Sequence, residues 1–324
     1  MGESYRLKTS EYPKVSILIP TFNQAEFIAC AVSSALAQMY PNLEVVVGDD
    51  ASTDHTQSAL ASFTDSRLRV FRNERNLGRV GNYRRLLHEH ATGDYVVNLD
   101  GDDYYTDVEF IAKAVGALSK NADVVVVSAR VLTRTSNGER ISRGPGYCSL
   151  SGLEVLRRMP AKELHLMHLA CVYRRRPAIE LDFYRSSAIS SDWESLYRLA
   201  VKGRVLFFPD VVGVWRIHSV NESQSVDLVK HLDNLTIWPS VYNEAVRAGM
   251  SRSVASLLCA RCVAHFALAS CLRVAAQDRS VVRRLIASMW ERHKCATLLM
   301  ILSPMSFARL VLCVLGYYRS RSLA

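Results

Sequence analysis

Three carboxylates crowd one short stretch of the chain, at Asp100, Asp102 and Asp103. They follow an apolar run, Tyr95 to Leu99, which is typical of a strand buried on both faces of a parallel sheet. Ligands of α/β proteins bind at the carboxyl ends of such strands. Carboxylates this close repel one another unless a cation, protons or open water compensates, and hard oxygen ligands favour Mg²⁺ or Mn²⁺. A solvated acidic turn explains the same pattern equally well.

The segments around this cluster alternate between short apolar runs and stretches of helical periodicity. Strands are expected at residues 15–20, 43–47, 67–71, 95–99, 123–128, 205–209 and 212–218, and helices at 26–38, 54–63, 80–90 and 109–118. Strands that alternate with helices of about 10–15 residues predict βαβ units on a parallel sheet, so the fold class is α/β. The polar, glycine-rich segment 130–149 is expected to be a loop.

A second strand end is also acidic, because the run at 43–47 leads into Gly48-Asp49-Asp50. Parallel strands open on the same edge of a sheet, so one acidic pair can hold a nucleoside and the other a metal that bridges its diphosphate. The sequence contains no Gly-x-Gly-x-x-Gly after the first strand and no Gly-x-x-x-x-Gly-Lys-[Ser/Thr]. A Rossmann dinucleotide site and a P-loop are therefore disfavoured.

Other polar residues have simpler explanations. Asp192 lies in the first turn of a helix predicted after Ile189, where a carboxylate can serve as an N-cap. His165 and His168 form a pair without further ligands and are interpreted as structural. The basic run Arg174 to Arg176 is either a solvated face or a contact for an anionic acceptor.

Composition indicates a globular protein with a large core. The 324 residues, 49% of them hydrophobic, can form one large domain or a domain with an appendage. The eight cysteines are scattered, and Cys259 and Cys262 fall in an apolar helical stretch, so reduced core thiols in the cytosol are expected. The polar segment 1–13 predicts no secretory signal.

Six motifs follow one another in order along residues 13–225. They are Pro20-Thr-Phe-Asn23, the segment 44–54 with its acidic pair, Asn76-Leu-Gly78, the segment 93–103, the segment 191–199 with Asp192 and Glu194, and the segment 215–223 with His218 and Asn221. Together they closely resemble glycosyltransferase family 2. The resemblance implies a GT-A fold, with a mostly parallel, Rossmann-like sheet flanked by helices, and an inverting transfer from a nucleotide-sugar, usually with a divalent metal.

The resemblance also implies which residues bind the donor. Those on the nucleotide-sugar side are Pro20, Thr21, Asn23, Asp50, Asn76 and Gly78. Asp50, rather than Asp49, is expected to take the base or ribose, while Ser52 and Asp54 are expected to cap a helix. Asp100 and Asp102 match the Asp-x-Asp motif, and Asp102 is expected to be the direct ligand of Mn²⁺ or Mg²⁺. His218 matches a histidine that reaches the metal or diphosphate in some members.

Asp192 matches the catalytic base of the family, although Ser191 stands where many relatives carry Glu. A carboxylate within hydrogen-bond reach removes the proton of the acceptor hydroxyl, which is worth about 10²–10⁴-fold in rate. The metal neutralises charge on the leaving nucleoside diphosphate. Single displacement inverts the anomeric carbon and needs no carboxylate nucleophile. Glu194 is the alternative base.

The basicity of the chain belongs to its tail. Residues 244–324 carry twelve basic and three acidic side chains, which accounts for the net charge of +9. Helical patterns fill 228–294, and apolar runs follow at 296–302 and 307–315. Pro304 and Arg309 are costly in a span of about 20 residues, so two short interfacial helices on anionic lipid are expected. A helical bundle packed on the domain or at a dimer interface is the alternative.

We therefore predict a GT-A domain at 1–227 and a basic helical region at 228–324 that associates with the membrane. The expected enzyme is peripheral on the cytoplasmic face of the cell membrane and uses a UDP-sugar. Its expected acceptor is a saccharide or lipid-linked saccharide of cell-surface polysaccharide or lipopolysaccharide synthesis. A homo-oligomer is possible, and the tail shows no nucleic-acid-binding module. The alternative function is a non-catalytic nucleotide-sugar-binding or scaffold protein.

Overall fold

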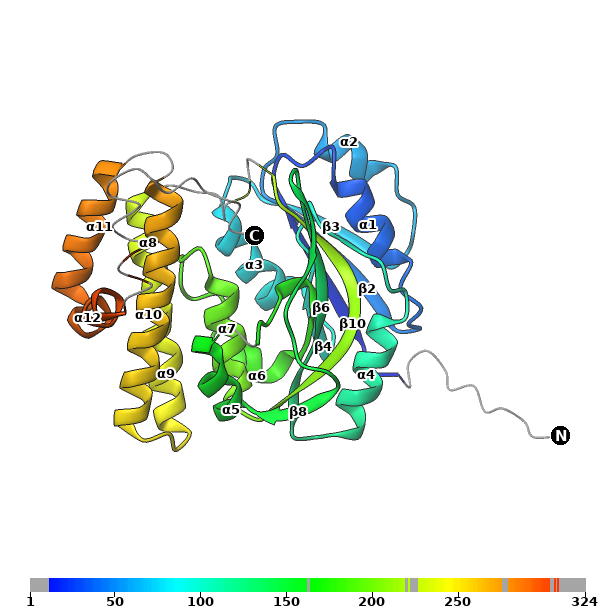
Figure 1. Ribbon diagram of the computed structural model, residues 1–324. Helices are drawn as coiled ribbons and strands as arrows, with labels where there is room; N and C mark the ends of the chain where they lie inside the picture. Colours follow the sequence, from blue (N-terminus) through cyan, green and yellow to red (C-terminus); the bar gives the residue numbers. More distant parts are fainter. Residues whose placement is uncertain are drawn as a thin grey trace.

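A ten-stranded sheet forms the centre of the protein (Figure 1). The computed structural model describes residues 12–161, 164–218, 221, 227–275, 279–303, 306 and 308. The strands are β1 Val15–Thr21, β2 Leu43–Asp49, β3 Leu68–Arg72, β4 Tyr95–Asn98, β5 Tyr104–Tyr105, β6 Val124–Thr135, β7 Gly138–Ile141, β8 Cys148–Ser151, β9 Cys171–Arg174 and β10 Arg204–Arg216. Their order is β3-β2-β1-β4-β9-β6-β10-β5, with β7 beside β6 and β8 beside β10.

The long strand pairings are parallel, as predicted. They are β1 with β2, β1 with β4, β2 with β3, and β6 with β10, whereas β9 is antiparallel between β4 and β6. All seven residues of β1 and of β2 are buried, because helices cover both faces of these strands. The continuous apolar runs in the sequence reflect this burial.

Helices form layers on both faces of the sheet. They are α1 Ile28–Leu36, α2 Thr56–Ala61, α3 Gly78–Arg85, which a π-helical turn Leu86–His90 continues, α4 Phe110–Lys120, α5 Gly152–Arg158, α6 Arg175–Glu180, α7 Ser191–Ala200, α8 Leu228–Leu235, α9 Ile237–Arg247, α10 Arg252–Ala275, α11 Arg279–Arg292 and α12 Lys294–Leu302. Figure 1 shows α1, α2 and α4 on one face, α3, α5, α6 and α7 on the other, and α8 to α12 outside α7.

The prediction that residues 130–149 form a loop is wrong. In the structure β6 continues to Thr135 and turns at Gly138, whose φ is 132°, into the antiparallel strand β7. All four residues of β7 are exposed, so the segment reads as polar although it is paired. The two strands expected at 205–209 and 212–218 are one strand, β10, whose pairing with β6 is irregular around Pro209.

The C-terminal helices share a hydrophobic core with the sheet domain. Trp193 of α7 packs against Trp238 of α9 and Phe266 of α10, with ring centroids 6.4 and 5.4 Å away. One helix among the described residues, Arg252–Leu272 within α10, has the length and composition of a membrane span, with a mean hydropathy of 1.7. Slightly less than half of its most apolar stretch, 44%, is buried inside the protein. The second interfacial helix expected at 307–315 lies almost wholly outside the described residues.

Glu44 of β2 joins three strands and the loop before β4 through a buried carboxylate. It accepts hydrogen bonds from Ser16 Oγ at 2.6 Å and Thr92 N at 2.8 Å, and pairs with Lys14 and Arg69 at 2.9 and 3.0 Å. Burial alone would raise the pKa of Glu44, but these hydrogen bonds outweigh it and lower the pKa to about 2. The ionised carboxylate therefore stabilises the fold.

Glu44→Gln is expected to lower the free energy of unfolding at pH 7 by about 2 kcal/mol, because charged hydrogen bonds are lost. The unfolded carboxyl titrates near a pKa of about 4.3, so this difference holds above about pH 5 and shrinks as pH falls toward 2. Urea unfolding at several pH values measures it. Glu89→Gln, at an exposed ion pair with Arg85, is the matched control and is expected to change little. A pH-independent difference for Glu44→Gln would contradict the electrostatic origin.

Candidate active site

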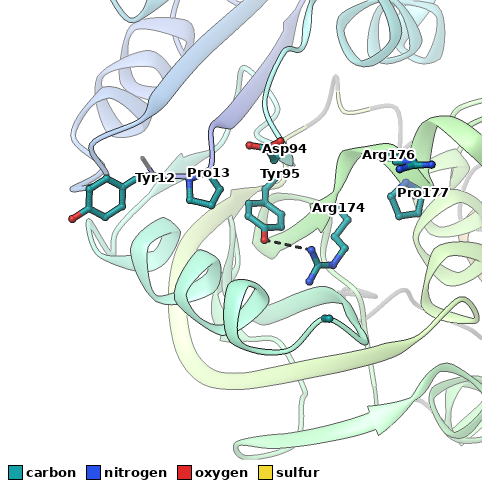
Figure 2. A pocket seen from close by; sticks show the side chains of 8 residues that line it. Tyr12, Pro13, Asp94, Tyr95, Arg174, Arg176 and Pro177 are labelled. Atoms are coloured by element: carbon teal, nitrogen blue, oxygen red, sulfur yellow. Dashed lines mark hydrogen bonds between the residues drawn. The ribbon is translucent and has the colours of Figure 1, made fainter. Parts of the chain in front are cut away.

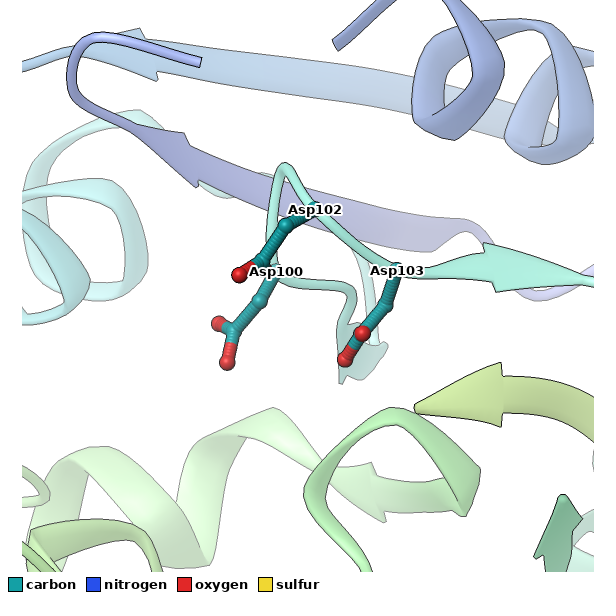
Figure 3. Close-up of side chains that lie close together, drawn as sticks. All are labelled: Asp100, Asp102 and Asp103. Carbon is teal, nitrogen blue, oxygen red and sulfur yellow. The ribbon is translucent and has the colours of Figure 1, made fainter. Parts of the chain in front are cut away.

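The acidic side chains that follow β4 converge at the carboxyl edge of the sheet. One carboxylate oxygen of each of Asp100, Asp102 and Asp103 lies within 4.8 Å of the other two, and the side chains extend from the same turn (Figure 3). Asp102 and Asp103 are 6% and 3% exposed, and Asp100 is half-buried. A solvated acidic turn is therefore excluded for Asp102 and Asp103.

This turn is pressed against the loop that follows β1. Leu99 N donates to the carbonyl of Leu18, and Gly101 N donates to that of Pro20, at 2.9 and 3.2 Å. A Cβ on Gly101 would lie 2.4 Å from Gln24 Oε1 and 3.0 Å from Thr21 Oγ1, so a larger residue would force the Gln24 side chain to move. The structure thereby brings Pro20 and Thr21, which belong to a separate motif, beside the acidic cluster.

Asp103 is tied to the neighbouring strand rather than turned toward open space. Its Oδ1 accepts a hydrogen bond from the backbone N–H of Arg216 at 2.8 Å. Burial, followed by the charges of Asp102 and Asp100, raises the pKa of Asp103 well above its usual value. Asp103 therefore supports the turn, and Asp100 and Asp102 remain as the candidate ligands of a cation.

Asp102 faces the segment after β10. Its Oδ2 lies 2.9 Å from His218 Nε2 and accepts a hydrogen bond from Asn221 Nδ2 at 3.0 Å. Burial and then the charge of Asp100 raise the pKa of Asp102, while His218 opposes the rise. The structure therefore joins Asp102 and His218, which lie far apart in sequence. Asn221 belongs to the same motif as His218, but no role was expected for it.

Arg216 and Phe27 complete this side of the cluster, and sequence reasoning missed both. The Arg216 guanidinium lies 4.9 Å from the ring centroids of Phe27 and Tyr104, and its Nε donates to the carbonyl of Asp102. His218 stacks on Phe27 with centroids 5.1 Å apart. The position of Arg216 within Trp215-Arg-Ile-His218 was the available signal.

Asp100 is linked to α3 by residues that no motif pointed to. Tyr83 donates a hydrogen bond to Asp100 Oδ1, and Arg79 Nη1 donates to the Tyr83 hydroxyl at 3.3 Å. Burial and then the charge of Asp100 raise the pKa of Tyr83 well above its usual value, so the phenol stays a donor. Arg79 follows Asn76-Leu-Gly78 directly, which extends that motif toward the acidic cluster.

The second acidic pair lies at the end of β2. Asp50 Oδ1 accepts hydrogen bonds from Asn73 Nδ2 at 2.7 Å and Leu77 N at 2.8 Å, so the loop carrying Asn76 and Gly78 folds around Asp50. Asp49 accepts from Ser52 N at 2.9 Å and Arg72 Nη1 at 3.1 Å through separate oxygens. Both Asp49 oxygens are occupied, which agrees with Asp50 as the expected nucleoside partner.

Asn23 holds two loops together. It adopts a left-handed conformation with φ of 51°, and its Oδ1 accepts from Thr53 N at 2.8 Å. Ser52 Oγ accepts from Asn23 N at 2.9 Å instead of capping α2, so the cap expected at Ser52 is wrong. Asp54 Oδ1 accepts from Thr56 N, the first residue of α2, but the N-cap position itself is occupied by His55.

Asp192 and Glu194 differ sharply in surroundings. Ser190 is the N-cap of α7, so the N-cap interpretation of Asp192 is wrong. Asp192 is half-buried, and no described residue donates a hydrogen bond to its carboxylate. Glu194 is 1% exposed and paired with Arg185 and Arg198 at 3.0 and 3.2 Å. The geometry excludes Glu194 as the alternative base.

His168 lies in a buried polar network, in agreement with a structural role. Its Nε2 is 2.9 Å from the Tyr184 hydroxyl, which donates to Asn98 Oδ1 at 2.9 Å. Burial lowers the pKa of His168, so the imidazole is neutral. Asn98 is the last residue of β4, and the network therefore stiffens the strand end that carries Asp100.

A surface pocket of about 660 Å³ lies elsewhere, at the amino-terminal ends of β1 and β4 (Figure 2). Tyr12, Tyr95 and Arg174 are among its lining residues. Arg174 donates to the carbonyls of Val124, Leu118 and Asn121, and so closes the end of α4. The basic run at 174–176 begins at the end of the sheet opposite the acidic cluster, which separates it from an acceptor bound there.

Comparison with known proteins identifies the family and the fold of this chain. The family described as "Glycosyl transferase family 2" matches residues 16–182. Staphylococcus aureus TarS 1–349 in complex with UDP superposes with a TM-score of 0.66 at 18% identity, over 94% of this chain and 89% of that one. The mannosyltransferase PcManGT of Pyrobaculum calidifontis, in complex with GDP-Man and Mn²⁺, superposes with a TM-score of 0.55 at 20% identity, covering 98% and 91%. These likenesses establish a GT-A fold, as predicted. The chain belongs to glycosyl transferase family 2.

Curated relatives match this chain over part of their length. An uncharacterized protein of Mycobacterium tuberculosis is 29% identical over 210 residues, 63% of this chain and 59% of that protein. The UDP-Glc:alpha-D-GlcNAc-diphosphoundecaprenol beta-1,3-glucosyltransferase WfgD of Escherichia coli is 37% identical over 91 residues, 28% of this chain and 36% of that enzyme. The chain thus spans between about a third and three fifths of these relatives.

Proposed function

We propose that this chain is an inverting glycosyltransferase that moves a sugar from a UDP-sugar to a hydroxyl of a saccharide or lipid-linked saccharide. We place it in the synthesis of cell-surface polysaccharide or lipopolysaccharide. The observation that carries the proposal is that Asp50 and the Asp100–Asp102–His218 group lie at the same edge of the sheet, with the start of the helix that carries Asp192 linked to them through Arg79. The UDP bound to TarS and the diphosphoundecaprenol acceptor named for WfgD support the donor and acceptor classes.

Asp100, Asp102 and His218 would hold a divalent cation, Mn²⁺ or Mg²⁺. Two carboxylates with neighbouring oxygens and an imidazole 2.9 Å from one of them suit a small hard cation. PcManGT carries Mn²⁺ on a similar fold, which supports the assignment. When bound, the cation neutralises charge that develops on the leaving diphosphate.

The chain's own residues bind the donor and remove the proton of the acceptor hydroxyl. Asp50 and the loop at 76–78 take the nucleoside, with Pro20, Thr21 and Asn23 beside it. The Asp192 carboxylate accepts the proton of the acceptor hydroxyl while that oxygen bonds to the anomeric carbon. The bond from the anomeric carbon to the diphosphate breaks, and the phosphate oxygen keeps the electron pair. Attack from the face opposite the phosphate inverts the configuration.

A transfer assay tests this function. The chain is incubated with Mn²⁺, a panel of labelled UDP-sugars and undecaprenyl-diphosphate-linked saccharides, and label is measured in the lipid phase. Metal-dependent transfer from a UDP-sugar is expected. A UDP-sugar that stabilises the chain, by about 2.7 kcal/mol at 100 times its Kd, without any release of UDP would favour the non-catalytic scaffold instead.

We also propose that the tail places the enzyme on the cytoplasmic face of the membrane. One side of α12 packs inward through Ala296, Thr297 and Met300. Its other side exposes Leu298, Leu299, Ile301 and Leu302, at 43%, 36%, 36% and 73%. Arg292 and Lys294 precede this apolar side, as in a helix that lies on anionic lipid.

Leu298→Glu with Leu302→Glu is expected to weaken binding to phosphatidylglycerol vesicles at least tenfold, because two exposed apolar contacts become anionic. Vesicle sedimentation measures the bound fraction. The control is Ile141→Glu on β7, which is 51% exposed in a different part of the surface and is expected to bind as the wild type does. Equal losses in both variants would contradict a docking role for α12.

A further inference from the structure

The peptide group between Ile189 and Ser190, just before Asp192, is hydrogen-bonded on both sides by side chains; we call it the clamped peptide. Arg79 Nη2 donates to the carbonyl of Ile189, and Asn234 Oδ1 accepts from Ser190 N at 2.7 Å. These two backbone groups belong to the same planar peptide unit. The described residues contain no cis peptide bond, so the carbonyl and the N–H point in opposite directions.

The two holding residues come from different parts of the chain. Arg79 lies in the first turn of α3 and also contacts Tyr83, which is bonded to Asp100. Asn234 lies near the end of α8, in the C-terminal helical region. The clamped peptide is therefore fixed between the donor side of the site and the C-terminal helices.

The peptide lies two residues before Asp192, at the start of α7. Ser190 is the N-cap, and its carbonyl accepts from Glu194 N at 3.1 Å, which begins the helical bonding. Ser191 offers no comparable support, because its hydroxyl is buried without a hydrogen-bond partner among the described residues. The orientation of the first turn of α7 therefore depends on the clamped peptide.

A second set of contacts joins α7 to the C-terminal helices. Ser240 of α9 donates to Glu194, and Arg185 donates to Ser240 Oγ at 2.7 Å. Trp193 packs on Trp238 beside it. These contacts fix α7 against the C-terminal helices, and Asn234 of α8 belongs to the same helical region.

We infer that Asn234 is a positioning residue for Asp192, so that the C-terminal region takes part in catalysis as well as in attachment. The inference rests on the proposed function of Asp192 as the base. Loss of the Asn234 acceptor frees the N–H end of the peptide and lets the first turn of α7 shift. A shift of about 1 Å in a reacting group can cost 10²-fold in rate.

Asn234→Ala is expected to lower kcat for sugar transfer about tenfold, with the donor KM and the Tm nearly unchanged. Asn234→Asp keeps the acceptor oxygen and is expected to retain most of kcat. The matched control is Asn243→Ala, because Asn243 is an exposed residue of α9 that makes no contact with the clamp. Hydrogen exchange at Ser190 is expected to be faster in Asn234→Ala alone.

A double-mutant cycle separates positioning from general structural damage. If Asn234 acts through Asp192, Asn234→Ala causes no further loss of kcat in an Asp192→Asn background. Three results would overturn this inference while leaving the proposed function intact. They are losses of kcat that multiply in the double variant, an unchanged kcat in Asn234→Ala, and a kcat in Asn234→Asp as low as that of Asn234→Ala. Absence of transfer by the wild type would overturn the proposed function, and this role with it.

Discussion

Asp192→Asn is expected to reduce kcat for sugar transfer by about 10²–10⁴-fold, because the amide cannot accept the proton of the acceptor hydroxyl. Binding of the UDP-sugar is expected to remain, since the proposed role of Asp192 is toward the acceptor hydroxyl and not toward the nucleoside or the cation. The fold is expected to remain as well, because Ser190, and not Asp192, is the N-cap of α7. Release of UDP measures kcat, and thermal shift with UDP-sugar and Mn²⁺ measures binding.

The control for this variant is Asp210→Asn, which changes an exposed carboxylate of β10 and is expected to leave kcat unchanged. Glu194→Gln is not a suitable control, since the buried Glu194 pairs with Arg185 and Arg198 and the loss of its charge would destabilise the fold. A kcat for Asp192→Asn within threefold of wild type would remove Asp192 from the role of base.

The acidic strand ends were predictable because the strands before them are buried on both faces. Such strands read as continuous β-branched and apolar runs, so β2 and β4 could be placed, and with them Asp50 and Asp100. The hairpin of β6 and β7 was missed because β7 is fully exposed and carries no apolar pattern. Its Asn137-Gly138 turn was the signal that could have revealed it.

The supporting contacts of the site could not be predicted from local patterns. Arg79 meets the carbonyl of Ile189 across 110 residues of sequence, and Asn234 meets Ser190 across 44. The choice between Asp192 and Glu194 depends on which of them is buried, and burial is a property of the packed helices. The sequence offered both carboxylates in one helical turn, and only the packing of α7 on α9 separates them.

Asp102→Ala is expected to lower Mn²⁺-dependent turnover at least about 10²-fold, because the lost charge stabilisation amounts to several kcal/mol. Asp102 is the buried carboxylate whose oxygen faces His218 and Asn221, so its removal takes away the ligand between Asp100 and His218. The thermal shift produced by UDP-sugar with Mn²⁺ is expected to fall as well. This second loss distinguishes Asp102→Ala from Asp192→Asn, for which the shift remains.

The unliganded Tm is the folding control for Asp102→Ala. Burial and the neighbouring charge of Asp100 raise the pKa of Asp102, so the ionised carboxylate is costly in the fold and its removal relieves repulsion. That relief offsets the lost hydrogen bonds to His218 and Asn221, and the unliganded Tm is expected to change little. Asp123→Asn, at an exposed carboxylate before β6, is the matched variant with full turnover expected. Wild-type turnover in Asp102→Ala, or equal turnover with and without a divalent cation in the wild type, would rule out a catalytic cation at this cluster.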